Sequence, residues 1–321
     1  MEDARLEEKK KEALIYLKKH RPDLLGLLSG VKEAGFISKV DERKKALLGK
    51  MGVEVSGFIE DLFGGLKESY IKELFSVDNV GTALNTVFMN SVHIYRVKEN
   101  RRVADTFPFL KEADAKPSFH KNVVIVEKGA SASILEACGG PKTAHGDLPL
   151  RADHSVFILE QGAKLTFQSY QDWRGVKNYH SRHFYLQNGA SLQWLDGHTG
   201  HCPLATYNHI EANRAKINLR TTAITKKEEK LSLHYSLNGN ENVAVHQIKS
   251  IEENHGSMEI FSSLETSHSK SAAPSSSLLT YLKNHGFEET MAQNLIHQDF
   301  LDDFLTDFPP EYQIEIMSHL G

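Results

Sequence analysis

The feature that most constrains the fold is a repeat of apolar positions around a Gly-Ala pair in the middle of the chain. Gly129, Gly162 and Gly189 are each followed by Ala, and the residues three and five positions before and after each glycine are all apolar. This alternation places those side chains on one face of two consecutive strands. The repeated apolar positions are Val124, Val126, Ala132 and Ile134; Phe157, Leu159, Leu165 and Phe167; and Phe184, Leu186, Leu192 and Trp194.

Two fainter copies of the repeat follow. One is anchored on Arg214 and the other on Asn240, so that successive anchors lie 33, 27, 25 and 26 residues apart. We expect the apolar residues around these two anchors to face the core as well. They are Ile217 and Leu219 after the first anchor, and Tyr235, Leu237, Val243 and Val245 around the second.

Two kinds of β structure produce this pattern. Asn188-Gly189 and Asn238-Gly239 are typical of hairpin turns, which favours a meander or sandwich. A parallel β-solenoid instead makes each unit one coil, with the Gly-Ala pair at a sharp corner and the same positions facing inward in every coil. The constant register favours the solenoid, and both folds stay open on the pattern alone.

The repeat region is flanked by helical segments, so we expect three regions: residues 1–86 (helical), 87–272 (β) and 273–321 (helical). The first is predicted from apolar residues near helical spacing and from a second helical run over residues 55–74. In the last, a helix ends at Gly286 and a second covers residues 288–304. Its large apolar residues either pack on the β region or bind a partner; our candidates for binding are Phe287, Leu295, Phe300 and Phe304.

Composition excludes several classes of protein. Of the 321 residues, 40% are hydrophobic and the net charge is −4, which argues against disorder and against a nucleic-acid or polybasic membrane binder. No stretch approaches the ~18 apolar residues of a membrane-spanning helix. The first residues, MEDARLEEKKKEALIYL, are too charged for a secretion signal. With two cysteines, a disulfide scaffold is excluded, and we expect a cytoplasmic protein.

Residues that could carry chemistry are few. Cys138 follows a strand, and Cys202 lies in the loop segment DGHTGHC; either could bind a metal, but the spacing of a structural zinc site is missing. No nucleotide-binding or hydrolase motif is present. Four carboxylates of the repeat region do not share one position of the repeat: Asp153, Glu160, Asp172 and Asp196. We therefore expect a non-catalytic protein. Two alternatives are a β-helix carbohydrate-active enzyme and a stand-alone Cys/His metal-binding protein.

Several segments, in order, resemble the SufB/SufD family of iron–sulfur cluster assembly proteins. They are KNVVIVEKGASASILEACG, HSVFILEQGAKLTFQSYQDW, GASLQWLDGHTG, VHQIKSIEENHGSMEIFSSL and SLLTYLKNHGFEETMAQNLIHQDFLDDF. The resemblance covers about residues 85 to 305. It implies a right-handed parallel β-helix with helical ends.

The resemblance also implies a role and partners. Family members pair through their β-helices, as SufB with SufD or as homodimers, and bind the ABC-type ATPase SufC through their C-terminal helical region. It implies a scaffold subunit that works with neither nucleic acid nor a membrane. A transient iron–sulfur cluster at a subunit interface is the only cofactor that it suggests.

The chain departs from the family pattern where SufB is expected to carry cysteines. After Leu264 the sequence runs almost directly into the terminal helices, so the cysteine of the SufB "CDSLL" segment has no counterpart. Tyr185 stands near the position of another SufB cysteine. His268 matches the family histidine before the helices in one of two alignments, and we take it, with Cys138 and Cys202, as a candidate metal ligand. These losses make the chain more similar to SufD than to SufB.

Overall fold

The computed structural model describes most of the chain. The described residues are 2–28, 42–57, 70, 74–112, 117–139, 150–172, 177–200, 204–225, 230–240, 243–252, 257–264, 266–272, 276–292, 295, 302, 305, 306, 310 and 313. Phe300, Phe304 and Cys202 lie outside them, and so does most of the run predicted as a helix over residues 55–74. No helix of the described part is long and apolar enough to span a membrane.

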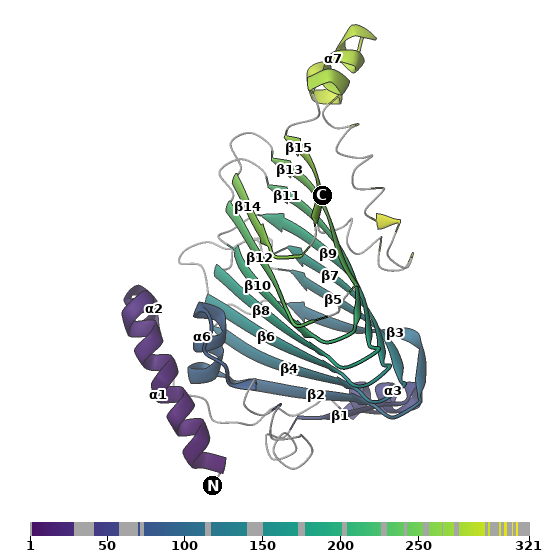
Figure 1. Ribbon diagram of the computed structural model, residues 1–321. Coiled ribbons are helices and arrows are strands. Elements are labelled where there is room, and N and C mark those ends of the chain that lie inside the picture. Colours follow the sequence, from purple (N-terminus) through teal and green to yellow (C-terminus); the bar gives the residue numbers. More distant parts are fainter. Residues whose placement is uncertain are drawn as a thin grey trace.

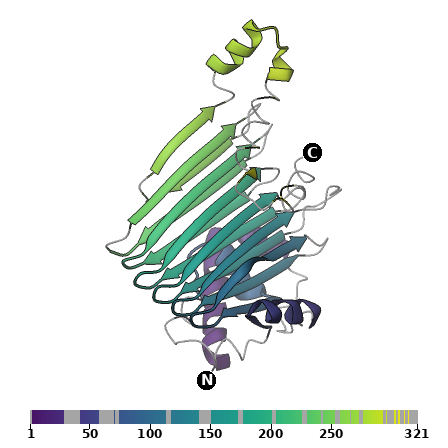
Figure 2. The same ribbon diagram turned by 90° about the vertical axis from the view of Figure 1, so that its right-hand side faces the viewer.

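The described strands form two facing sheets, which approach each other along one side of the molecule, where consecutive strands are joined (Figure 1). The order is β1-β2-β4-β6-β8-β10-β12-β14 in the eight-stranded sheet and β15-β13-β11-β9-β7-β5-β3 in the seven-stranded sheet. Every pairing is parallel except that of β1 with β2. The chain therefore alternates between the sheets and rises by one strand in each (Figure 2), which confirms the parallel β-solenoid.

The strand bounds place nearly all of the β structure in the repeat region. The strands are β1 (Val53–Ser56), β2 (Ser91–Val97), β3 (Arg102–Glu112), β4 (Ser118–Val126), β5 (Ser131–Gly139), β6 (Leu150–Leu159), β7 (Lys164–Asp172), β8 (Lys177–Leu186), β9 (Ser191–Gly200), β10 (Leu204–Ala212), β11 (Lys216–Thr225), β12 (Lys230–Asn238), β13 (Val243–Glu252), β14 (Ser257–Ser262) and β15 (Thr266–Ala272).

The Gly-Ala pairs form the corner between the sheets. Gly129, Gly162 and Gly189 have φ values of 65°, 68° and 73°, a region that glycine enters without steric cost. Each N–H donates to the corner of the next coil: Gly129 N to Gln161 O (3.0 Å), Gly162 N to Asn188 O (3.1 Å) and Gly189 N to Arg214 O (3.0 Å). The two Asn-Gly signals do not form hairpins, because the strands on either side of each belong to different sheets.

The repeat pattern holds at every inward position of the first three units and fails in part at the last. Ile217 and Leu219 are buried as expected, but Val243 and Val245 are 65% and 41% exposed. The strand after Asn240 begins one residue later than in the preceding coils, since Val243 pairs with Lys216. A shift of one residue turns the opposite face of a strand inward.

Helices cover the outer face of the eight-stranded sheet at one end (Figure 1). Leu17 of α1 (Glu2–His20), Leu24 of α2 (Pro22–Leu27) and Leu84 of α6 (Val80–Phe88) pack with Phe119 and Ala152 of the sheet. We call these three helices the N-terminal cap. They bury an outer face that would otherwise expose apolar side chains to water.

Three further elements, β1, α3 (Glu42–Met51) and α7 (Ser276–Asn284), lie outside the repeat region. Val55, expected in a helical run, lies in β1, which pairs antiparallel with β2 and extends the sheet beyond the first coil. Leu48 of α3 packs into the same core cluster as β1. Helix α7 lies beyond the last coil. Gly286, two residues after its last residue, has φ = 90°, as expected of a helix-terminating glycine.

Candidate functional site: a buried charged cluster between the sheets

The inward-facing side chains of each coil change from apolar to polar with distance from the corner. The first two inward residues of β5, β7 and β9 are apolar, as in Ile134, Phe167 and Trp194, and all are buried. The next inward residues on these strands are mostly polar: Glu136, Ser169, Gln171, Asp196 and His198. The two sheets therefore enclose polar side chains beyond the apolar core.

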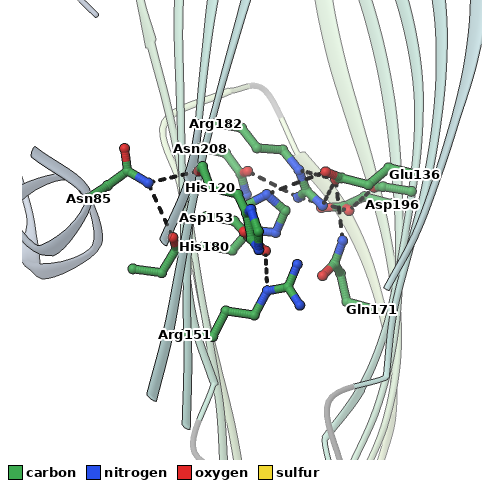
Figure 3. A network of polar contacts seen from close by, with 12 residues as sticks. Asn85, His120, Glu136, Arg151, Asp153, Gln171, His180, Arg182, Asp196 and Asn208 are labelled. Carbon is green, nitrogen blue, oxygen red and sulfur yellow. Dashed lines mark hydrogen bonds and ion pairs between the residues drawn. The ribbon is translucent and has the colours of Figure 1, made fainter. Parts of the chain in front are cut away.

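Arg182 of β8 is the centre of this polar region (Figure 3). Its Nη2 donates to Glu136 Oε2 over 2.9 Å, and its Nε reaches the same oxygen at 3.1 Å. Its Nη1 lies 3.3 Å from Asp196 Oδ1 and donates to Asn208 Oδ1 over 3.4 Å. One guanidinium thus joins carboxylates from β5 and β9 across the interior. We name Glu136, Arg182 and Asp196 the charged cluster.

Further polar side chains and two aromatic rings surround the charged cluster. Gln171 Nε2 donates to Glu136 over 3.3 Å, and the imidazole Nε2 of His180 lies 3.7 Å from the other oxygen of Glu136. The guanidinium carbon of Arg182 lies 5.6 Å from the ring centre of Phe167 and 5.5 Å from that of Trp194. These contacts satisfy a charge that would be very costly to bury alone.

Asp196 links the charged cluster to the following coils. Its Oδ2 accepts a hydrogen bond from Tyr235 Oη over 2.6 Å and lies 2.9 Å from His198 Nε2. Thr221 Oγ1 contacts both Tyr235 Oη (3.2 Å) and His246 Nε2 (2.8 Å). A continuous line of polar contacts therefore runs along the solenoid axis from β5 to β13.

Complete burial shapes the protonation of these groups. Burial alone raises the pKa of Asp196, but His198 and Arg182 outweigh it and hold that pKa below its usual value. Burial, together with Asp196, raises the pKa of Tyr235 well above its usual value. At neutral pH Asp196 is therefore a carboxylate and Tyr235 is a neutral donor to it.

The site residues predicted from sequence do not belong to the charged cluster and lie in different parts of the molecule. Cys138 is buried, 2% exposed, on β5 and follows Glu136 by two residues on the same face. His268 lies in β15, where it pairs in register with Ile248. Phe287 and Leu295 are 37% and 44% exposed, beyond the last strand. In the described part of the chain, no three His, Cys, Asp or Glu groups are arranged to hold a metal ion.

The charged cluster was missed in the sequence, although the repeat contains the signal for it. Glu136 and Asp196 each stand seven residues after a corner glycine, Gly129 and Gly189. Glu136 is not among the four carboxylates named from the sequence, and the shared position is visible only when Glu136 is included. Arg182 stands seven residues before Gly189. Extending the repeat by one more inward position on each side finds all three charges.

Comparisons with known proteins agree with this architecture. Residues 109–256 match the family model "SUF system FeS cluster assembly, SufBD core domain". An iron–sulfur cluster assembly SufBD family protein of Staphylococcus haemolyticus is 23% identical over 147 residues, 44% of this chain and 30% of that protein. The iron–sulfur cluster assembly protein SufB of Bacillus subtilis is 24% identical over the same shares of each chain.

These matches concern the solenoid. Residues 109–256 run from within β3 to just beyond β13, and they include the whole charged cluster. The aligned part covers 30% of the length of each of these two relatives. The core of the chain, residues 109–256, is therefore similar to the SufBD core domain of the SUF iron–sulfur cluster assembly system.

Proposed function

We propose that the chain is a non-catalytic subunit of a SUF-type iron–sulfur cluster assembly complex in the cytosol. In this role it pairs with a SufB-like subunit, or with a second copy of itself, and binds a SufC-like ATPase. A transient iron–sulfur cluster is the cargo of the complex and forms at a subunit interface. The observation that carries the proposal is the match of the SufBD core domain to the stretch that folds as the solenoid.

The far end of the solenoid supports the pairing. β14 and β15 are the last strands of their sheets, and within the described residues each has only one neighbouring strand. A strand with one free edge can accept another strand through its backbone. Phe261 of β14 is 53% exposed beside this edge, which gives an apolar contact for a partner.

The segment after the solenoid supports binding of the ATPase. Tyr281 of α7 is 56% exposed, and Phe287, Met291 and Leu295 follow with exposures of 37%, 57% and 44%. Several large apolar residues exposed along one short segment are typical of a protein interface. Phe300 and Phe304, the other two candidates from sequence, lie outside the described residues.

The geometry of the carboxylates does not favour the carbohydrate-active alternative. That reading expects an acidic pair on an open groove, where a sugar could reach it. Glu136 and Asp196 are instead 0% exposed, and both bind Arg182. Carboxylates that are buried and bound to an arginine in this way are not placed to donate a proton to the leaving group of a sugar.

An anaerobic pull-down tests the proposal. The tagged chain is incubated with cytosol of its native cell, and the bound proteins are identified by mass spectrometry. We expect a SufC-type ATPase together with a SufB-type subunit. Recovery of the ATPase alone, with the chain dimeric by sedimentation, supports the homodimeric form. Recovery of neither contradicts the proposal.

A pair of variants tests the surface for the ATPase. Phe287→Asp introduces a charge at the proposed contact and should reduce the recovery of the ATPase at least tenfold. Ile15→Asp is the matched control, because Ile15 is 68% exposed on α1, at the opposite end of the molecule (Figure 1). Equal recovery with both variants would show that the ATPase binds elsewhere.

A further inference from the structure

A cleft of about 400 Å³ opens on the outer face of the eight-stranded sheet, where the N-terminal cap ends. Tyr16 and Asp78 line it from the side of the cap, and side chains of β8, β10 and β12 line it from the sheet. The cleft lies on the opposite side of the sheet from the charged cluster, because His183 and Arg182 are consecutive residues of one strand. It is therefore a separate site.

Two histidines form the floor of this cleft. His183 of β8 and His209 of β10 pair in register on adjacent parallel strands, one coil apart. Their ring centres are 5.7 Å apart. Both side chains point outward from the sheet, so their nitrogens are presented to one small volume.

A carboxylate stands beside each imidazole at an unusual separation. Asp78 Oδ2 lies 3.8 Å from His183 Nε2, and Glu211 Oε1 lies 3.6 Å from His209 Nε2. Both distances exceed the ~3.2 Å of a hydrogen bond. They match two ligands of a common ion, since metal–ligand bonds of about 2.0–2.2 Å at tetrahedral to trigonal angles put the ligand atoms about 3.3–3.8 Å apart.

The ring of His209 is oriented as in a metal-binding histidine. His209 Nδ1 lies 2.7 Å from Ser236 Oγ, which leaves its Nε2 for the cleft. His183 is 2% exposed, and its Nδ1 has no hydrogen-bond partner.

The carboxylates have room to move. The side chains of Asp78 and Glu211 are 59% and 50% exposed, and among the described residues neither has a lysine or arginine partner. In their present rotamers the donors form two pairs and do not surround one point, in line with the lack of any three-donor group in the described part of the chain. Binding of one ion requires the two carboxylates to change rotamer, which an exposed side chain does at little cost.

We propose that Asp78, His183, His209 and Glu211 bind one divalent transition-metal ion, such as Zn²⁺ or Fe²⁺. Imidazole nitrogens and carboxylate oxygens suit these ions better than Ca²⁺ or Mg²⁺. The site differs in every residue from the cysteines and the histidine considered from sequence. The inference goes beyond the proposed function and does not depend on it, since binding is measured on the isolated chain.

Titration with Co²⁺ tests the site directly. The full chain is prepared without a polyhistidine tag, stripped of metal and titrated while the visible absorption of bound Co²⁺ is recorded; Zn²⁺ is then added as competitor. We expect one tight equivalent that Zn²⁺ displaces. His183→Gln and His209→Gln should each weaken binding at least tenfold, and Glu211→Gln several-fold.

Controls separate this site from the other histidines of the chain. His285→Gln changes an exposed histidine beyond α7 and should leave the tight equivalent unaltered. Because His183 is buried, its substitution could also disturb the fold; the partly exposed His209 and Glu211 carry the test in that case. The proposal is overturned if no stoichiometric binding occurs, or if His209→Gln and Glu211→Gln both bind Co²⁺ as the unaltered chain does.

Discussion

Near the corner, the interior of the solenoid holds stacked rings, whereas farther along the same strands it holds charges. Phe157 and Phe184 lie 4.5 Å apart and nearly parallel at 7°, while Arg182 sits two residues before Phe184 on the same face of β8. In the apolar half, apolar side chains of suitable shape and size are sufficient for packing, so every coil can supply them. In the charged half, each buried charge requires an oppositely charged side chain from a neighbouring coil. Buried ion pairs of this kind are not needed to stabilise a stack of coils.

The largest effect is expected in the apolar half. Phe184→Ala removes a fully buried ring that packs on Phe157 and lies 4.7 Å, centre to centre, from Trp194. The loss of buried area and the cavity left behind should lower the free energy of unfolding by about 4 kcal/mol. Denaturant unfolding followed by circular dichroism measures this value. A loss below about 1 kcal/mol would mean that the ring stack does not hold the coils together.

The charged half should respond differently to single and combined changes. Arg182→Met leaves Glu136 and Asp196 buried without their cation and should cost about 3 kcal/mol of unfolding free energy. Combining it with Glu136→Gln and Asp196→Asn removes the stranded charges and should recover most of that loss. If the combined variant is no more stable than Arg182→Met, the charges themselves stabilise the fold, and the contrast between the two halves disappears.

A third prediction concerns pH and the sheet face beneath the N-terminal cap. Burial lowers the pKa of His183 to about 4 and that of His154 well below its usual value. Three groups that face His183 also act on its pKa: Asp78 raises it, and His209 and Lys121 lower it. Between pH 6.5 and pH 4 the unfolded chain binds more protons at His183 than the folded chain does.

The free energy of unfolding should therefore fall as the pH drops through this window, by on the order of 2 kcal/mol for His183. The carboxylate of Asp196 acts in the same direction but at lower pH, since its folded pKa is held below the usual value. Unfolding measured at pH 7, 6, 5 and 4 tests this. His183→Gln should flatten the upper part of the profile, and an unchanged slope would assign the effect to other groups.

The smallest effect is expected at the corner. Gly162 has φ = 68°, but an added Cβ would meet nothing within 4 Å. Arg214 adopts φ = 53° at the equivalent corner, so a side chain is tolerated there. Gly162→Ala should therefore cost only about 1 kcal/mol. Gly239→Ala is the contrasting variant, because its Cβ would lie 1.6 Å from Ala212 O and should cost considerably more.

Local pattern was sufficient for the apolar half of the interior. Period-2 alternation around Gly129, Gly162 and Gly189 predicted which side chains face inward, because one buried face fixes the register of a strand. It failed at Val243 and Val245, where one extra residue after the corner exchanges the faces. A single inserted residue leaves no mark in composition or in periodicity within the strand itself.

The sites were harder to predict, because their residues come from different coils. Glu136 and Asp196 are separated in space by only one intervening strand, β7, yet they are 60 residues apart in sequence. His183 and His209 are separated by one coil and become neighbours only when β8 and β10 are aligned in register. Candidates chosen by residue type alone, such as Cys138 and Cys202, do not use this stacking. Aligning the coils before searching for chemistry would have found both groups.

The hydrogen bonds at the corner have a consequence for how the molecule comes apart. Each corner N–H binds the next coil and no coil farther away, as Gly129 binds Gln161 and Gly162 binds Asn188. Stability is then a sum over neighbouring coils, and opening can begin at an end without disturbing the middle. Amide hydrogen exchange should therefore show a gradient, fastest in β14 and slowest in the central coils. A fluctuation of the terminal coil would loosen the pairing edge while the charged cluster stays closed.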